Sequence, residues 1–342
     1  MKYIKSFLAV LMAAVLLIGC RGGKEEASSA LPQSSTPVSS GESEPQSSEP
    51  SVSAPSALVP SVEVSGEYGD LLKNMNASGK TLKGFGALAN AEYSQPLDEL
   101  NKILQNYSRN ISLVAYSLDG KKAIGYNTGA QIFCACTVKA PYTLYCLMQM
   151  EKGKATLDTE MTYEQKHYEP GTGDMQYKPF GTVFDMRTML HKSMSISDNV
   201  GYMMAVDYFG RDGYNAWVSS ISAPSMQIKP TVWSLRANAL DLAICWREIY
   251  KYFCRGGEYA EFLYNSCTGT EGNYSTQSLN VEFSHKQGHN RSGDWTSYSD
   301  AGIVWKNGAP YILAIITDAP GPSSYDAGVF ADIANIIHNE LF

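Results

Sequence analysis

The sequence predicts an α+β domain in which one antiparallel sheet takes strands from both ends of the folded region. Residues 111–127 read as a strand, an Asp119-Gly120 turn and a second strand. Residues 281–319 contain three more runs rich in β-branched and aromatic residues, separated by turns. We therefore expect a five-stranded antiparallel sheet flanked by terminal helices, with an inserted all-helical subdomain at about 142–275.

Helical periodicity supports both terminal helices. Residues 94–108 place apolar side chains on one face of a helix, namely Leu97, Leu100, Leu104 and Tyr107. Residues 325–341 have the pattern of a closing amphipathic helix. In the inserted region, residues 184–210 predict two helices that break near 195–199, and residues 235–253 predict another.

The N-terminus has the features of a targeting segment. Lys2 and Lys5 precede an apolar run over residues 6–18, which is short for a membrane span and typical of a signal peptide. The run ends in Leu17-Ile18-Gly19-Cys20, which resembles the bacterial lipoprotein signal. That resemblance implies that residues 1–20 are the signal, that Cys20 is lipidated, and that the protein is exported and anchored to the outer face of the cell membrane. The alternative is an uncleaved anchor.

Composition then divides the rest of the chain. Residues 21–62 are dominated by Ser, Pro and Glu and contain few bulky apolar residues, so we expect a disordered linker. Residues 63–94 have no clear period and stay unassigned, and residues 95–342 form the folded domain. With 27 Lys and Arg against 34 Asp and Glu, the net charge is −7, which argues against a nucleic-acid partner.

Six cysteines lie beyond Cys20, and spacing alone cannot pair them, so their disulfide state stays open. They are Cys134, Cys136, Cys146, Cys245, Cys254 and Cys267.

Residues 132–147 read as the entrance to a helix that opens at Cys136 or Thr137. A helix N-terminus and a neighbouring ammonium both favour a thiolate, so Cys136, three residues before Lys139, is either a reactive thiol or an ordinary buried cysteine.

Three polar clusters fall at element boundaries. Cys136-Thr137-Val138-Lys139 starts a helix, Ser197-Asp198-Asn199 lies at a helix break, and Lys286-Gln287-Gly288 lies in or just after a strand. Each alone is weak, because Ser-Asp-Asn is most often a helix cap and a strand lysine is most often solvated. Their order, their intervals and their element types together form a specific pattern.

This pattern resembles the penicillin-recognising enzymes, which include class A β-lactamases, D,D-peptidases and transpeptidases. Their motifs are Ser-x-x-Lys, Ser-Asp-Asn and Lys-Thr-Gly. The resemblance covers about residues 95–342 and is closest to the class A branch. It implies a β-lactamase/transpeptidase-like fold, acyl transfer without a cofactor or metal, and a β-lactam or a peptidoglycan stem peptide as the partner.

The sequence departs from the family at three points. Cys136 stands where the family has a serine nucleophile, and Gln287 stands where a small hydroxyl residue helps to hold the substrate carboxylate. The third departure concerns the Glu that class A enzymes use for deacylation. The matching stretch, residues 221–243, contains no Glu, and its only acid is Asp241.

The resemblance assigns roles to the clustered residues. Cys136 would be the nucleophile, Lys139 its base or part of its proton relay, and Ser197 the proton shuttle to the leaving nitrogen. The substrate-binding residues would be Asn199, Lys286, Gln287 and Gly288.

The oxyanion would be held by the backbone N–H of Cys136 and a second one from His289 or Asn290. His285 and His289 are four residues apart, but on a strand and turn this spacing favours no metal site.

Three hypotheses follow. The first is an exported lipoprotein that performs acyl transfer or amide hydrolysis on a β-lactam or peptidoglycan peptide through Cys136. The second is a catalytically inactive module of the same fold that binds peptidoglycan or a partner protein. The third makes Cys134 or Cys136 part of a structural disulfide. The thiol state of Cys136 discriminates among them.

Overall fold

The computed structural model describes residues 59, 61–75, 79–230 and 235–342. The predicted signal peptide and all of the predicted linker except residues 59, 61 and 62 lie outside these residues. Within the described part of the chain, no helix has both the length and the apolar character needed to cross a bilayer.

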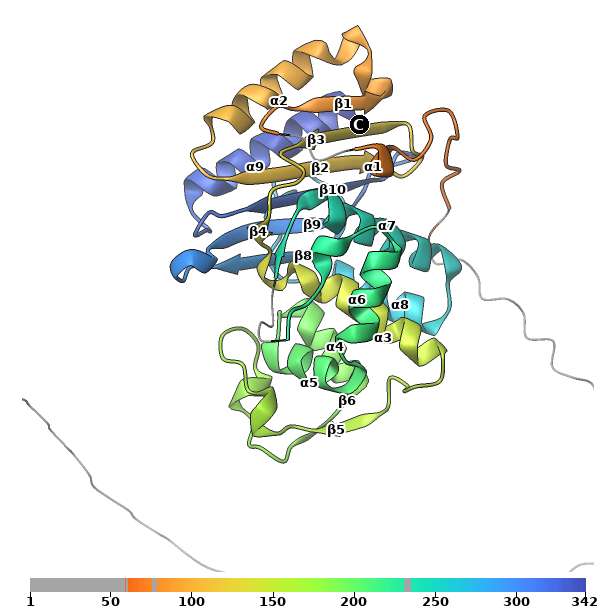
Figure 1. Cartoon of the computed structure of the whole chain (residues 1–342), viewed down its shortest axis with the longest axis vertical. Coiled ribbons are helices and arrows are strands. Elements are labelled where there is room, and N and C mark those ends of the chain that lie inside the picture. The colour runs from red at the N-terminus through yellow and green to blue at the C-terminus, as the bar shows by residue number, and fades with distance from the viewer. Residues whose placement is uncertain (1–58, 60, 76–78, 231–234) are drawn as a thin grey trace, which may run out of the picture. The chain divides into compact units, whose positions relative to one another are not determined.

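The sheet has six strands, all paired antiparallel, in the order β1-β3-β2-β10-β9-β8 (Figure 1). The bounds are β1 Lys83–Gly86, β2 Ile111–Ser117, β3 Lys122–Tyr126, β8 Glu282–Asn290, β9 Ser297–Trp305 and β10 Tyr311–Thr317. The α+β class, the hairpin at residues 111–127 and the three late strands are confirmed. Because β2 pairs with β10, the sheet does take strands from both ends of the folded region.

The expected count of five strands is wrong, because β1 adds a sixth at the edge beside β3. Its sequence, Lys-Gly-Phe-Gly, has no alternation that would mark a strand. The packing explains the glycine at residue 84: a Cβ there would come within 2.5 Å of the Leu88 carbonyl oxygen. This strand is therefore specified by a close tertiary approach that a local pattern does not reveal.

Side chains of the central strands pack into two cores on opposite faces of the sheet. On β10, Tyr311, Leu313 and Ile315 pack into one core. Ile312, Ala314 and Ile316 pack into the other. Both faces are covered, which explains why this strand reads as an unbroken apolar run.

The terminal helices cover one face. They are α2, Ser94–Asn106, and α9, Ser324–Ile336, which continues as a π-helical turn over Ile337–Leu341. Leu100 and Leu104 are buried in the core of this face, as the periodicity predicted. The Tyr107 hydroxyl donates to Asp326 Oδ1 over 2.7 Å and so joins the end of α2 to α9.

The opposite face packs against the helical region, in which α7 contacts β2, β9 and β10, and α8 contacts β8 (Figure 1). Its helices are α3 Lys139–Glu151, α4 Met186–Ser195, α5 Asn199–Phe209, α6 Asp212–Ser220, α7 Ala239–Arg255 and α8 Glu258–Thr268. A short helix, α1 Leu71–Asn74, precedes the sheet.

The inserted region is not all-helical, which corrects the expectation from the sequence. It contains the ribbon β5–β6, Glu160–Thr162 with Val183–Asp185, and β7, Arg236–Ala237, which pairs with β4, Ile132–Phe133. These strands are two or three residues long, which is below the length at which a period can be read.

Candidate active site

Cys136 lies on a tight turn that connects β4 to α3. The turn, Ala135–Val138, is a 3₁₀ helix, and α3 begins at Lys139, so the α-helix starts later than the predicted Cys136 or Thr137. Ala135 adopts a φ of 48°, a left-handed conformation that is uncommon for a residue with a Cβ. The Cys134 N–H donates to Leu235 O over 3.0 Å and fixes the start of the turn. A strained backbone thus presents Cys136 at the head of α3.

The second cluster forms the break between α4 and α5. Ser197 has a φ of 58°. Asp198 is the N-cap of α5 and accepts from Gly201 N–H over 2.9 Å. Its other carboxylate oxygen accepts from Met175 N–H over 2.9 Å. The aspartate is therefore a structural cap, and it turns Ser197 and Asn199 toward Cys136 and Lys139.

The third cluster lies within β8 and closes the site from the sheet side. Lys286 Nζ donates to Ser197 Oγ. A Cβ at Gly288 would come within 2.7 Å of the Cys136 backbone nitrogen, so only glycine lets β8 approach the turn this closely. The structure thus brings all three predicted clusters together.

Lys139 is fully buried and holds the second cluster through its ammonium group. Nζ donates to the Ser197 carbonyl oxygen over 2.6 Å, to Asn199 Oδ1 over 2.7 Å and to the Asp198 carbonyl oxygen over 3.3 Å. Burial lowers the pKa of Lys139 below the ordinary value of a lysine, although the nearby Cys136 and Asp198 oppose this effect. A buried lysine with a lowered pKa is suited to accept a proton.

Two opposing effects set the pKa of the Cys136 thiol. Burial raises it, whereas the positive charges of Lys139 and Lys286 and hydrogen bonds from Lys139 and Ser197 lower it. The lowering effects win, so the pKa of Cys136 lies below its ordinary value. By contrast, burial raises the pKa of Cys146 and of Cys245 well above the ordinary value. Cys136 is thus the thiol in an electropositive setting.

Lys286 is also fully buried, at 0% exposure. Burial and the charge of Lys139 lower its pKa to about 8, although Cys136 and Asp300 oppose the shift. Two ammonium groups therefore flank one thiol, and each cation depends on the thiolate for compensation.

These groups border a cavity of about 280 Å³. Its lining residues are Cys136, Thr172, Ile196, Ser197, Glu271, Gly272, Gln287, Gly288 and His289. His289 is among these lining residues and Asn290 is not, so His289 is the better candidate for the second oxyanion N–H.

Sequence reasoning missed one wall of this cavity, which the loop over residues 169–173 supplies. Thr172 Oγ1 donates to the Ser197 carbonyl oxygen over 2.6 Å, and Asn199 Nδ2 donates to Pro170 O over 3.2 Å. Glu169 lies close enough to Lys139 for their charges to interact, and burial raises the pKa of its carboxyl group. The Gly-rich Pro170–Gly173 segment was the only local signal for this loop.

The two strand histidines have separate partners. His285 Nδ1 lies 2.8 Å from Asp300 Oδ1 in the buried layer, and His289 Nδ1 lies 2.8 Å from the Tyr274 hydroxyl. Across the described residues, no group of three His, Cys, Asp or Glu side chains could hold a metal ion. Their geometry is that of structural contacts.

None of the six described cysteines is joined in a disulfide; five of them are buried and Cys254 is partly exposed. This contradicts the hypothesis that Cys134 or Cys136 forms a structural disulfide. Cys134 is fully buried at the start of the Ala135–Val138 turn and lines no part of the cavity.

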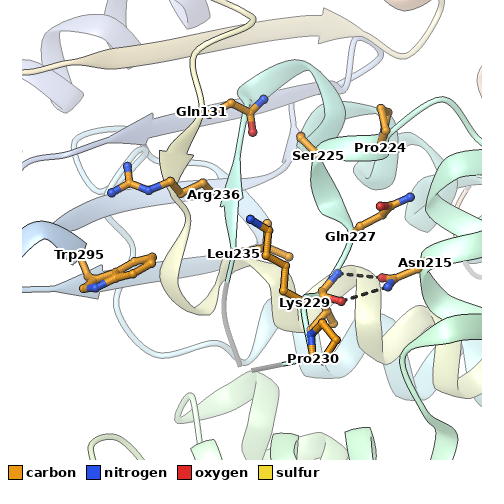
Figure 2. Close-up of a pocket in the computed structure, with 11 residues that line it drawn as sticks. Gln131, Asn215, Pro224, Ser225, Gln227, Lys229, Pro230, Leu235, Arg236 and Trp295 are labelled. Atoms are coloured by element: carbon orange, nitrogen blue, oxygen red, sulfur yellow. Dashed lines mark hydrogen bonds between the residues drawn. The ribbon is translucent and has the colours of Figure 1, made fainter. Parts of the chain in front are cut away.

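A larger cavity, of about 630 Å³, is lined by residues between 224 and 230 and by Leu235 and Arg236, together with Gln131, Asn215 and Trp295 (Figure 2). Asn215, at one side of it, makes two hydrogen bonds with the Ile228 backbone, and the Arg236 guanidinium lies over the Trp295 ring, 5.3 Å from its centroid. No Cys or His is among its described lining residues. Asp241, the sole acid of the stretch, accepts from Ser225 N–H over 2.7 Å and lines neither cavity. The smaller cavity is therefore the candidate active site.

The fold and the three clusters define an acyl-transfer enzyme scaffold of the β-lactamase/transpeptidase type. The model of the beta-lactamase enzyme family matches residues 95–341, so the chain belongs to this family. No curated protein matches the chain.

Solved structures with the same fold have low sequence identity to this chain. A structure of PBP-A is 18% identical, with a TM-score of 0.64, and the match covers 71% of this chain and 94% of that chain. A β-lactamase from Chitinophaga pinensis is 20% identical, with a TM-score of 0.63, covering 71% of this chain and 98% of that one. The TLA-1 extended-spectrum β-lactamase is 16% identical, with a TM-score of 0.63, covering 71% and 96%.

Proposed function

We propose that the protein is an exported, lipid-anchored acyl transferase or amide hydrolase that acts on peptidoglycan peptides or β-lactams through Cys136. One observation carries the proposal: the Cys136 thiol lines a cavity between two buried lysines, and its pKa is lowered although the residue is buried. A structural cysteine would instead resemble Cys245, whose pKa burial raises.

The geometry supports a two-stage acyl transfer. Sγ of Cys136 attacks the amide or lactam carbonyl carbon, and the carbonyl π electrons move to oxygen, which the backbone N–H groups of Cys136 and His289 would stabilise. When the oxyanion re-forms the carbonyl, the C–N bond breaks and Ser197 Oγ gives its proton to the leaving nitrogen. Ser197 is replenished by Lys286, whose Nζ contacts its Oγ. The product is a thioester on Cys136.

Lys139 and Asn199 complete the proton path and the binding surface. Lys139 has the lowered pKa needed to take the thiol proton and is held by Asn199 Oδ1. Asn199 Nδ2, bound to Pro170 O, keeps the 169–173 loop against the site. Water or an amine then resolves the thioester, giving hydrolysis or transfer.

A similar solved structure supports the reaction class: a mutant of PBP-A was solved as an acyl-enzyme complex with penicillin G. The alternative function is a catalytically inactive module that binds peptidoglycan or a protein. The absence of Glu from residues 221–243 favours this alternative, because that stretch supplies the deacylation base in the class A branch.

Intact-mass analysis separates the two functions. The purified protein is incubated with a panel of β-lactams and acyl thioesters, and the mass is followed over time. We expect a single adduct that maps to Cys136, that disappears in Cys136→Ala and that persists in Cys254→Ala, a matched cysteine variant outside the site. The absence of any adduct across the panel would leave the binding module as the function.

A further inference from the structure

Gln287 spans the floor of the candidate site, and both ends of its carboxamide are engaged. Oε1 accepts from Lys286 Nζ over 2.9 Å, and Nε2 donates to the Glu271 carbonyl oxygen. The side chain is 8% exposed. It is therefore held in place beside the nucleophile.

This arrangement uses the whole donor capacity of Lys286. An ammonium group carries three N–H donors. They meet Ser197 Oγ, the Gln287 carbonyl oxygen at 3.2 Å and Gln287 Oε1 at 2.9 Å. A substrate carboxylate can bind this cation only by displacing one of these acceptors. The Gln287 amide oxygen is the side-chain acceptor that is not part of the proton path, and it occupies the place of an anionic acceptor.

The surrounding charges act in the same direction. Glu271 lines the same cavity, and its negative charge disfavours a second anion there. A pKa of about 8 means that Lys286 loses part of its charge in mildly alkaline solution. Among the described residues, Nε2 of Gln287 has one acceptor, so its second hydrogen remains for a neutral substrate oxygen.

We propose that Gln287 makes this site selective for acyl donors that carry a neutral amide, and not a free carboxylate, on the leaving-group side of the scissile bond. Such donors are peptides with a C-terminal carboxamide or with a further peptide bond at that position. The inference rests on the proposed function of Cys136, and it names the substrate class of the same site.

Two matched acyl thioesters test the selectivity. One has mercaptoacetate as the leaving group, and the other has mercaptoacetamide. Thiol release and the mass of acylated Cys136 are measured for the wild type, for Gln287→Thr and for Gln287→Met. The methionine variant retains the side-chain length and frees one N–H of Lys286. Both thioesters carry the same acyl group. Comparing the ratio of the two rates between proteins therefore removes the intrinsic difference in reactivity between the two leaving groups.

We expect the amide-to-acid rate ratio to fall about tenfold in both variants, since a hydrogen bond to a charged group is made available to the carboxylate. Gln165→Thr, which makes the same type of substitution at an exposed position outside the site, should keep the wild-type ratio. Thermal melting confirms that each variant is folded.

The outcomes separate this inference from the proposed function. If Cys136 is acylated but the ratio is unchanged in both variants, or if the wild type prefers the carboxylate after correction for uncatalysed reactivity, the selectivity proposal is overturned and acyl transfer stands. If neither thioester acylates Cys136 in any variant, the proposed function fails, and the selectivity fails with it.

Discussion

Nζ of Lys139 lies 2.7 Å from Oδ1 of Asn199, so the first residue of α3 is joined directly to the first residue of α5. The same ammonium donates to two further carbonyl oxygens, those of Ser197 and Asp198. Lys139 is therefore both a cation beside the thiol and the brace of the α4–α5 turn. Its removal should affect thiol chemistry and the position of Ser197 together.

Cys136 should be the first cysteine to react with iodoacetamide at mildly acidic pH, because two ammonium groups favour its thiolate. Lys139→Met should slow this labelling by about tenfold or more, since one nearby charge shifts a pKa by about 1–3. Peptide mapping by mass spectrometry gives the order of labelling. Cys245 is the internal reference, and equal labelling of the two cysteines would exclude a reactive thiol at position 136.

The pH dependence of Cys136 alkylation should have a definite direction. The thiolate is the deprotonated form, so a nearby cation lowers the pKa, and alkylation should reach half its maximum below about 8.5, the value of a free cysteine. Lys286→Met should move this midpoint upward. Acylation should decline again as pH rises through about 8, where Lys286 loses the proton that it supplies to Ser197. A midpoint that does not respond to Lys286→Met would contradict the assigned electrostatics.

Gly288→Ala should disrupt the site, because its Cβ would lie 2.7 Å from Cys136 N and 2.9 Å from Cys134 O, both backbone atoms. We expect a loss of about 1–3 kcal/mol in the free energy of unfolding, together with loss of acylation. Gly328→Ala is the matched control, since its Cβ meets nothing within 4 Å and it lies in α9. The control should be neutral or slightly stabilising. Chemical denaturation measures both, and equal stability of the two variants would refute the close approach.

Efficient β-lactam turnover should be absent. Asp241 is committed to Ser225 and lines no part of the site, and a general base typically contributes a factor of about 10²–10⁴. Nitrocefin should therefore give at most one equivalent of rapid release followed by a slow phase. Rapid multiple turnover would mean that another base acts, and its loss in Glu169→Gln would assign that base to the loop at residues 169–173.

Cys20 should carry the lipid anchor, since it ends the apolar run of the signal. Cys20→Ala should either leave the membrane fraction or accumulate with its signal uncut. Fractionation with mass analysis of the N-terminal peptide distinguishes these from normal processing. Processing and fractionation identical to those of the unmodified sequence would rule out this anchor.

Sequence reasoning succeeded where a local pattern reflects a local cause. The spacing of Leu100 and Leu104 marks a helix face, and Asp198 follows helix-capping chemistry, so both could be placed without coordinates. The order of the motifs also correctly predicted that Cys136 and Lys286 lie close together.

What could not be predicted depends on contacts between distant segments. The edge strand containing Gly84 exists because the backbone at Leu88 approaches it, and nothing in its own four residues encodes a period. The orientation of the Gln287 carboxamide depends on the Glu271 carbonyl oxygen, and the Glu271 N–H is in turn held by the Ser195 carbonyl oxygen at the end of α4. The spacing of residues along the sequence does not reveal such a chain of contacts.

The pairing of β2 with β10 has a consequence for the order of events during folding. A chain that emerges from its N-terminus exposes residues 111–117 long before their partners at residues 311–317. The central sheet, and with it the β8 strand that carries Lys286, can assemble only after nearly the whole domain is available. Until then the Cys136 thiol lacks one of its two cations and keeps a more ordinary reactivity. The lowered pKa of Cys136 is therefore a property of the fully assembled sheet.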